Sequence, residues 1–201
     1  YKIDSKNSTR TYVDENFDSV FGTGNALQND LTISGGNENS NYFFSLGHLD
    51  QDGVIRNASY ERTNARLNYE AKLNDKITLS TKMAYTFTES NRIQQSSNVS
   101  GLMLGLLRTP PDFDGRDYKG TYYSSGGTEY INRGRSYRKS IGESSNQSYT
   151  NPLWTVNEQE SSTKVNRITV TPQLTIKPTN WLQVITRGNV DVADDKRTYF
   201  F

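Results

Sequence analysis

The 201-residue sequence contains no cysteine, so a disulfide framework, a thiol nucleophile and a cysteine metal site are all excluded. It also lacks a charge excess. Its 23 basic and 22 acidic side chains leave a net charge of +1, without the basic surplus that nucleic-acid binding usually shows. No apolar run approaches the length of about 18 residues that a spanning helix needs. We therefore expect no nucleic-acid partner and no helical membrane anchor.

Apolar residues are scarce, at 32% of the chain, but aromatic residues are not. The 13 Tyr, 8 Phe and 2 Trp argue against disorder, because disordered segments are depleted in aromatics. Tyr and Phe are also enriched in β-strands. Strands whose apolar residues fill only every second position explain both observations. The chain begins at Tyr1, which is neither an initiator Met nor the start of a signal peptide, so we expect an excerpt of a longer all-β protein.

The clearest local pattern is a strict alternation of side-chain type between residues 59 and 90. Apolar or small side chains fill every second position from Thr63 to Leu73 and again from Ile77 to Phe87. The positions between them are mostly polar and begin with Arg62, Asn64, Arg66 and Asn68. Such alternation predicts two strands whose two faces differ chemically.

The register of this hairpin follows from its turn, Asn74-Asp75-Lys76. Pairing Leu73 with Ile77 keeps apolar side chains opposite mostly apolar ones along both strands, as one buried face requires. The same register places Glu70 diagonally from Lys82, within reach of a favourable charge contact. We therefore predict a well-specified antiparallel hairpin.

A second hairpin is predicted toward the end of the chain. Pairing Ile176 with Leu182 places Arg167 opposite Asp191 on the polar face. Pro172 lies within the first of these strands, where it has no N–H to give to a ladder. We expect a β-bulge near Pro172.

The connections between the six expected strands alternate in length. The short ones lie near residues 37–40, 74–76 and 177–181, and the long ones at 49–58 and 91–162. All short turns therefore lie at one end of the sheet and all long loops at the other. Four parts follow from this layout: an irregular segment at 1–27, four strands within 28–90, a long loop at 91–162, and two strands within 163–201 that lead into a further loop.

Short turns at one end and long loops at the other are typical of outer-membrane barrels, whose long loops are extracellular. The strand at residues 59–73 would span about 50 Å at roughly 3.3 Å per residue, more than the barrel's apolar band of about 25 Å. A soluble β-sandwich that binds carbohydrate or mediates adhesion would show the same alternation. Patterning alone does not decide what covers the apolar face.

The long loop carries the remaining candidates for a binding site. Leu102, Met103, Leu106 and Leu107 follow Ser100, an acceptable helix N-cap, and predict a short helix that packs the loop or docks a partner. Aromatic side chains among many Ser, Gly and Asn residues suit sugars or peptides. The candidates for substrate contact are Tyr122, Tyr123, Tyr137 and Trp154.

No combination of residues supports catalysis or metal binding. The single histidine, His48, follows a strand, and nothing in the sequence places a nucleophile beside it. The sequence Asp112 to Asp117 has the acidic spacing of a calcium loop, but Tyr123 occupies the position of the bidentate Glu. We expect no enzyme activity, no metal and no cofactor.

A series of short segments does identify a family. In order, they are Phe17 to Phe21, Leu31 to Gly36, Tyr42 to Gly47, Asp50 to Ile55, Arg62 to Asn68, Leu106 to Asp114, Asn151 to Trp154 and Val165 to Ile168. This ordered set resembles the SusC/RagA-type TonB-dependent outer-membrane transporters of the Bacteroides group, and it covers most of residues 17–192. The family's plug and its TonB-contacting segment have no counterpart here, so energy coupling is assigned to no residue of this chain.

The resemblance implies a bacterial outer-membrane importer of oligosaccharides or peptides, built as a plugged barrel of about 22 strands. It implies a SusD-type surface lipoprotein as partner, contact with outer-membrane lipid, and coupling to the TonB complex through regions absent from this chain. If the apolar face meets lipid, the polar face lines the lumen. The lumen-facing candidates are Arg62, Asn64, Arg66, Asn68, Arg167 and Asp191.

Overall fold

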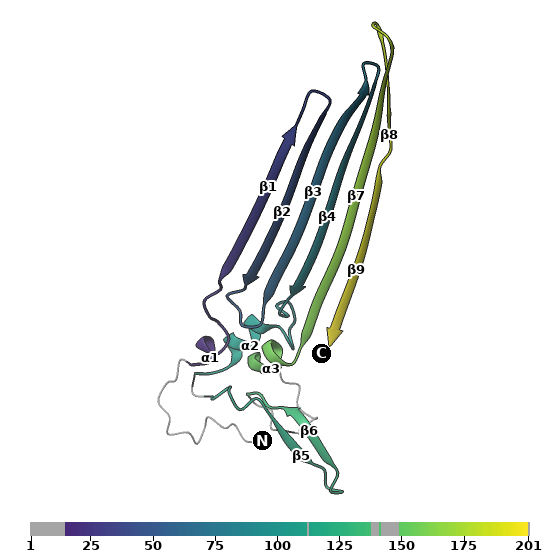
Figure 1. Ribbon diagram of the computed structural model, residues 1–201. Coiled ribbons are helices and arrows are strands. Elements are labelled where there is room, and N and C mark those ends of the chain that lie inside the picture. Colours follow the sequence, from purple (N-terminus) through teal and green to yellow (C-terminus); the bar gives the residue numbers. More distant parts are fainter. Residues whose placement is uncertain (1–14, 112, 138–140, 142–148, 201) are drawn as a thin grey trace.

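The computed structural model describes residues 15–111, 113–137, 141 and 149–200, so the first half of the segment at 1–27 lies outside the described residues. Seven strands form one antiparallel sheet in the order β1-β2-β3-β4-β7-β8, and β9 also pairs with β7 (Figure 1). These strands are β1 (Ala26–Gly36), β2 (Ser40–Asp52), β3 (Ser59–Asn74), β4 (Ile77–Asn91), β7 (Glu160–Thr179), β8 (Leu182–Arg187) and β9 (Val190–Phe200). Every strand expected from the alternation is present.

The hairpin of β3 and β4 has the predicted register over most of its length. The pairs run without a shift from Ser59 and Asn91 to Lys72 and Thr78. At the turn, however, the predicted pairing of Leu73 with Ile77 is wrong, because Ile77 pairs with Asn74 across a bulge. The Asn74 side chain accepts a hydrogen bond from the Lys76 backbone N–H at 2.9 Å, and this local turn tightens the connection.

The predicted register of the second hairpin is wrong by two residues. Ile176 pairs with Val184, and Arg167 pairs with Ala193 rather than with Asp191. The cause lies at the turn, where Thr179 pairs with Leu182 and a register shift separates this pair from the rest of the ladder. A shift of two residues keeps every side chain on its predicted face, because the side-chain period of a strand is two.

The predicted bulge at Pro172 is also wrong, since β7 pairs with β4 without a shift through this residue. The irregularity lies instead in the facing chain, which is interrupted between β8 and β9. There the Gly188 N–H donates to the Pro172 carbonyl at 3.0 Å. Pro172 has no N–H and cannot donate the second hydrogen bond of this residue pair. The regular strand pairing is therefore interrupted in the chain that faces Pro172, between β8 and β9.

One face of the sheet is apolar across its whole width, and we call it the apolar face. One row across the strands joins Ile33, Phe44, Leu67, Met83, Val170 and Val190, and the next joins Leu31, Leu46, Ala65, Tyr85, Ile168 and Val192. Many of these side chains are about half exposed. Among the described residues no second sheet covers them, so the β-sandwich alternative has no structural support.

The apolar face ends at a row of charges near the long loops. This row pairs Asp50, Glu61, Glu89, Lys164 and Lys196 in turn. From there to the short turns, β3, β4 and β7 carry no charged side chain on this face. On β3 this uncharged stretch runs from Thr63 to Leu73, about 33 Å at roughly 3.3 Å per residue. Tilted by about 40°, it is about 25 Å tall, the height of the apolar band of an outer-membrane barrel.

The buried apolar core lies in the loops rather than on the sheet. Its members are Val20, Ile93, Leu102, Leu106 and Val156, with Phe21, Ile55, Ala58 and Leu153 packed against them. They belong to the helices α2 (Leu102–Arg108) and α3 (Pro152–Asn157), to the residues that follow α1 (Glu15–Asp18), and to the loops after β2 and β4. We call this assembly the loop cap. It sits at the end of the sheet opposite the short turns (Figure 1).

The expected helix is α2, and its buried residues Leu102 and Leu106 join the core of the loop cap, as predicted for packing. Its N-cap is Gly101, not Ser100, and makes no side-chain capping bond. The Ser100 carbonyl instead accepts a hydrogen bond from Thr155 Oγ1 of α3 at 3.1 Å. Across the described residues, no helix is long and apolar enough to cross a membrane.

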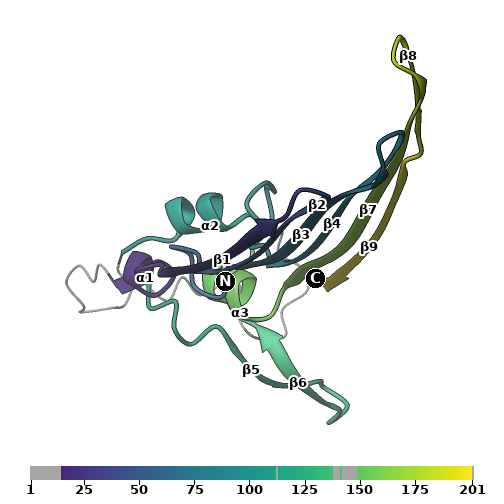
Figure 2. The ribbon, with the colours of Figure 1, turned by 45° about the horizontal axis from the view of Figure 1, so that its top comes forward.

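A hairpin of β5 (Lys119–Tyr123) and β6 (Glu129–Gly134) was not predicted. It extends from the loop cap away from the sheet (Figure 1), and in Figure 2 it lies on the opposite side of the sheet from α2. Its tip is a turn in which Gly127 takes a φ of 79°, a conformation that favours glycine. The sequence signal was the pair Gly126-Gly127 between two Tyr-containing stretches.

Candidate functional site

The six predicted lumen-facing residues share the second face of the sheet, which we call the polar face. The register joins Asn64, Thr86 and Arg167 in one row across β3, β4 and β7. Asp191 of β9 lies opposite Thr169, two residues from Arg167. The Arg167 guanidinium still reaches the Asp191 carboxylate and donates from Nε at 2.9 Å. Arg167 and Asp191 are therefore in contact, but as a diagonal pair and not as the directly opposite pair predicted from the sequence.

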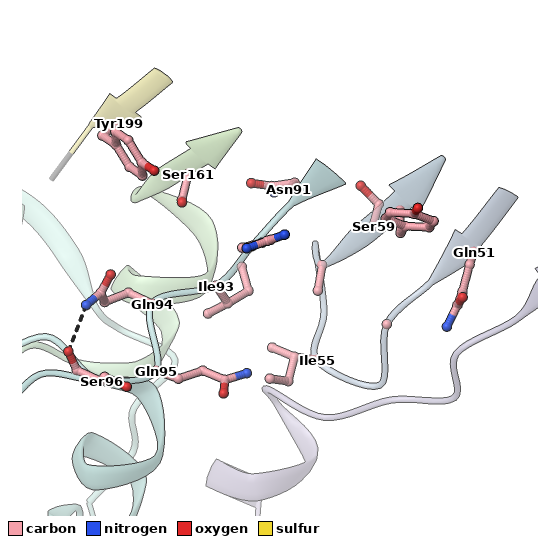
Figure 3. A pocket seen from close by; sticks show the side chains of 14 residues that line it. Gln51, Ile55, Ser59, Asn91, Ile93, Gln94, Gln95, Ser96, Ser161 and Tyr199 are labelled. Carbon is pink, nitrogen blue, oxygen red and sulfur yellow. Dashed lines mark hydrogen bonds between the residues drawn. The ribbon is translucent and has the colours of Figure 1, made fainter. Parts of the chain in front are cut away.

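A pocket of about 540 Å³ opens where the polar face meets the loop cap (Figure 3), and we call it the mouth pocket. Gln51, Tyr60, Ser161 and Tyr199 reach it from the ends of four strands. Asn91, the last residue of β4, also lines it, together with Arg92 to Ser96 in the segment that follows. The lining is rich in amide and hydroxyl groups and includes one cation, Arg92.

A second hollow of about 280 Å³ lies further along the polar face, and we call it the wall hollow. Its lining residues are Arg66, Asn68, Lys82, Met83, Ala84, Thr169 and Thr171. Lys82 does not make the contact with Glu70 expected from the sequence, because no ion pair of the described residues joins them. Two cations therefore line this hollow together.

The lumen-facing residues predicted from the sequence do not include Lys82, Thr169 or Thr171, and no residue of the mouth pocket is among the predicted site residues. The signal that could have found the first three is the period of two itself, extended from β3 to its neighbours in the sheet. The mouth pocket has no such signal, because most of its wall comes from irregular segments whose position depends on the loop cap.

The four predicted aromatic contacts are not brought together in one site. Tyr122 and Tyr123 lie on β5. The Tyr122 ring faces that of Tyr130 at 6.0 Å, and the Tyr123 hydroxyl donates to Glu129 at 3.0 Å. Tyr137 packs edge-on against Phe113, and Trp154 packs edge-on against Tyr118. Only Tyr123, with 62% of its surface exposed, lies mostly open to solvent.

The base of the hairpin is fixed to α3 by three side chains. The Tyr118 hydroxyl and the Lys119 ammonium both donate to Oε1 of Glu158, at 2.8 and 2.6 Å. The hydrogen bond from Lys119 is the main cause that lowers the pKa of Glu158. Burial, followed by the bond to Glu158, raises the pKa of Tyr118. The carboxylate is thus held in its charged form, and it anchors the hairpin to the loop cap.

Comparisons with known proteins agree with this geometry. No protein-family model matches the chain. TonB-dependent receptor P39 of Formosa agariphila is 32% identical over 101 residues, 49% of this chain, and TonB-dependent receptor P26 of the same bacterium is 27% identical over 110 residues, 54% of this chain. These matches span only 10% and 11% of the two relatives.

Two solved structures share the fold. The RagAB peptide importer in its closed-closed state matches with a TM-score of 0.67 and 21% identity, and the RagAB peptide transporter with 0.67 and 19%. Each match covers 93% of this chain and 19% or 20% of the solved chain. The open sheet therefore has the fold of a segment of a large β-barrel wall. Over about half of its length the chain is also similar to TonB-dependent receptors, in line with the SusC/RagA-type resemblance of its ordered segments.

Proposed function

We propose that this chain forms part of the wall and one large surface loop of an importer in the bacterial outer membrane. The importer takes up oligosaccharides or peptides and works with a SusD-type surface lipoprotein. The observation that carries the proposal is the sheet with two different faces. An uncharged band of about 25 Å suits lipid on one side, while a polar wall with a pocket at its end suits a solute on the other.

The polarity of the sheet supports a direction of transport. The turns β1–β2, β3–β4 and β7–β8 lie at the end that we assign to the periplasm, and the loop cap lies at the end that we assign to the exterior. A solute would first meet the mouth pocket and then pass along Arg62, Asn64, Arg66 and Asn68. Energy from the TonB complex would act through parts of the protein outside this chain.

The projecting hairpin is the described feature best placed to meet a lipoprotein lid. Tyr123 and Ile131 are 62% and 63% exposed, and Tyr130 adds a third side chain on the same hairpin. Aromatic residues are enriched in the contact surfaces of protein partners. Tyr137 and Trp154, by contrast, pack against loop-cap residues, so we assign them to holding the loop rather than to binding substrate.

Deletion of the full gene in its host bacterium tests the proposal. The intact protein should fractionate with the outer membrane and require detergent for solubility. The deletion strain should lose uptake of at least one member of a panel of labelled oligosaccharides and peptides, and expression from a plasmid should restore it. A protein that is soluble without detergent, or a deletion that leaves uptake of the whole panel unchanged, contradicts the proposal.

A further inference from the structure

The polar face carries cations that its carboxylates do not neutralise. Of the acidic residues on this face, Asp191 is engaged by Arg167 and Asp195 by Arg197. Asp30 and Glu70 also lie on this face and form no ion pair with another described residue. Arg62, Arg66 and Lys82 have no carboxylate within ion-pair distance in the described part of the chain. Near the long loops, the carboxylates of Asp50, Glu61 and Glu89 all lie on the apolar face instead. On the polar face, cations therefore outnumber carboxylates.

Two of these cations line the same space. Arg66 and Lys82 both border the wall hollow, and Lys82 pairs with Asn68, the next residue along the polar face from Arg66. Like charges on neighbouring strands repel unless a counter-charge lies near them. The Thr169 and Thr171 side chains border the hollow from the opposite strand, and Asn68 adds an amide. The hollow therefore offers two cations and several hydrogen-bonding groups to one anionic group.

Arg62 connects the wall hollow to the mouth pocket. Tyr60, Arg62, Asn64 and Arg66 follow one another on the polar face of β3 at intervals of roughly 7 Å. The Nε atom of Arg62 is buried without a hydrogen-bond partner among the described residues, and so is Oδ1 of Asn91 in the mouth pocket. Buried polar atoms in native proteins almost always have a hydrogen-bond partner, so these two atoms are available to a bound group.

We propose that Arg62, Arg66, Lys82 and Arg92 form an anion-binding track for an oligosaccharide that carries carboxylate or sulfate groups. This inference rests on the proposed import function and specifies its solute. Guanidinium and ammonium groups bind such anions with charge-assisted hydrogen bonds. The amides of Gln51, Asn91, Gln94 and Gln95 suit sugar hydroxyls.

The test uses the full-length transporter in its host bacterium and, purified in detergent, in binding assays. The probes are tetragalacturonate and a sulfated galactose tetrasaccharide, each beside its neutral counterpart, the methyl ester and the desulfated sugar. Binding and uptake are compared for the intact protein, the double variant Arg66→Gln/Lys82→Gln, the charge-conserving double variant Arg66→Lys/Lys82→Arg, and the control Lys72→Gln. Lys72 lies on the same strand and face as Arg66 but next to the short turn.

The intact protein should bind at least one acidic probe about tenfold or more tightly than its neutral counterpart, and added salt should weaken that binding. The double Gln variant should lose this preference, while the charge-conserving variant keeps most of it and Lys72→Gln keeps all of it. Outer-membrane amounts of each variant, measured by immunoblot, confirm that it is assembled.

Three outcomes overturn the track. The first is equal binding of acidic and neutral probes. The second is a gene deletion that abolishes uptake of neutral sugars or peptides only; import then stands, but the track does not. The third is a double Gln variant that loses thermal stability while it binds acidic sugars as before. Arg66 and Lys82 would then form ion pairs with an acidic group of the transporter itself. A deletion that changes no uptake at all contradicts the import function instead.

Discussion

Asn16 and Asn151 stabilise the loop cap by forming hydrogen bonds to the N–H and the carbonyl of Gly115. The Gly115 N–H donates to Asn16 Oδ1 at 3.2 Å, and the Gly115 carbonyl accepts from Asn151 Nδ2 at 3.0 Å. Asn151 is only 3% exposed, and its Oδ1 also accepts from the Leu153 N–H to cap α3. Three segments that lie far apart in the sequence thus meet at one backbone unit.

Replacing Asn151 with Ala should loosen this junction. The helix loses its N-cap, which typically costs about 1 kcal/mol, and the Gly115 carbonyl loses its partner, which costs about 1–3 kcal/mol when buried. Hydrogen exchange in the full-length protein should become faster in α3 and around Gly115. The matched control is Asn98→Ala, since Asn98 is exposed in the same loop. Equal protection in both variants would contradict this role for Asn151.

The contact of Glu158 with Lys119 makes the stability of the β5–β6 hairpin depend on pH. The pKa of Glu158 is lowered in the folded loop, chiefly by Lys119, so the contact stabilises the hairpin above the carboxyl's unfolded pKa of about 4.3. This contribution is lost as pH falls through the lowered pKa. Lys119 is 39% exposed, so solvent screening limits the contribution to about 1 kcal/mol or less.

The protection of hairpin amides against hydrogen exchange, measured relative to the unfolded rate at each pH, should therefore fall below about pH 4 in the intact protein. In Glu158→Gln this protection should already be lower at pH 7 and should change less on acidification. The control is Glu129→Gln, which removes a carboxyl from the hairpin but leaves its base untouched. A hairpin that responds to acid as strongly in Glu158→Gln as in the intact protein would rule out Glu158 as the cause.

In β3 and β4, side chains of the same strand lie on two faces with different environments. Met83 lies in the middle of the apolar face, in the row with Leu67 and Val170. Ser80, three residues away, lies on the polar face opposite Glu70. If the apolar face meets lipid, these two positions should respond in opposite ways to the same charge.

Met83→Arg should destabilise the assembled barrel by about 2–4 kcal/mol, the cost of an Arg at the bilayer midplane. Ser80→Arg should be tolerated, because its side chain meets water or Glu70. Urea unfolding of the full-length protein in lipid vesicles measures both. Comparable losses of stability in the two variants would show that the apolar face does not contact lipid.

At the scale of the whole molecule, the described sheet leaves its two edges and its apolar face uncovered. Leu31, Ile33 and Val192, near these edges, are 52%, 48% and 55% exposed. Unpaired strand edges and broad apolar surfaces favour association with other chains. In the intact barrel, neighbouring strands and lipid would cover them.

The 201-residue chain expressed alone should consequently aggregate in buffer and need detergent to remain dispersed. Size-exclusion chromatography with light scattering, run with and without detergent, measures this. A stable monomer in buffer alone would mean that the apolar face finds a cover within the chain, contrary to the open sheet.

The sequence by itself determined the strands, their two faces and the register of β3 with β4. These features are local, because a side-chain period of two and a turn such as Asn74 to Lys76 act within a few residues. The ordered segments added the resemblance to a family. The face of Arg167 and Asp191 was also predicted correctly, since an error of two residues in register leaves the faces unchanged.

Only the tertiary structure decided the loop cap, the mouth pocket and the partnership of Arg66 with Lys82. These depend on contacts between residues far apart in the chain, such as the hydrogen bond from Asn57 Nδ2 to the Val156 carbonyl. No periodic pattern records such contacts, because irregular segments are positioned by packing rather than by a repeating backbone geometry. The break opposite Pro172 has the same origin: the missing N–H belongs to β7, but its effect falls on the strand that pairs with it.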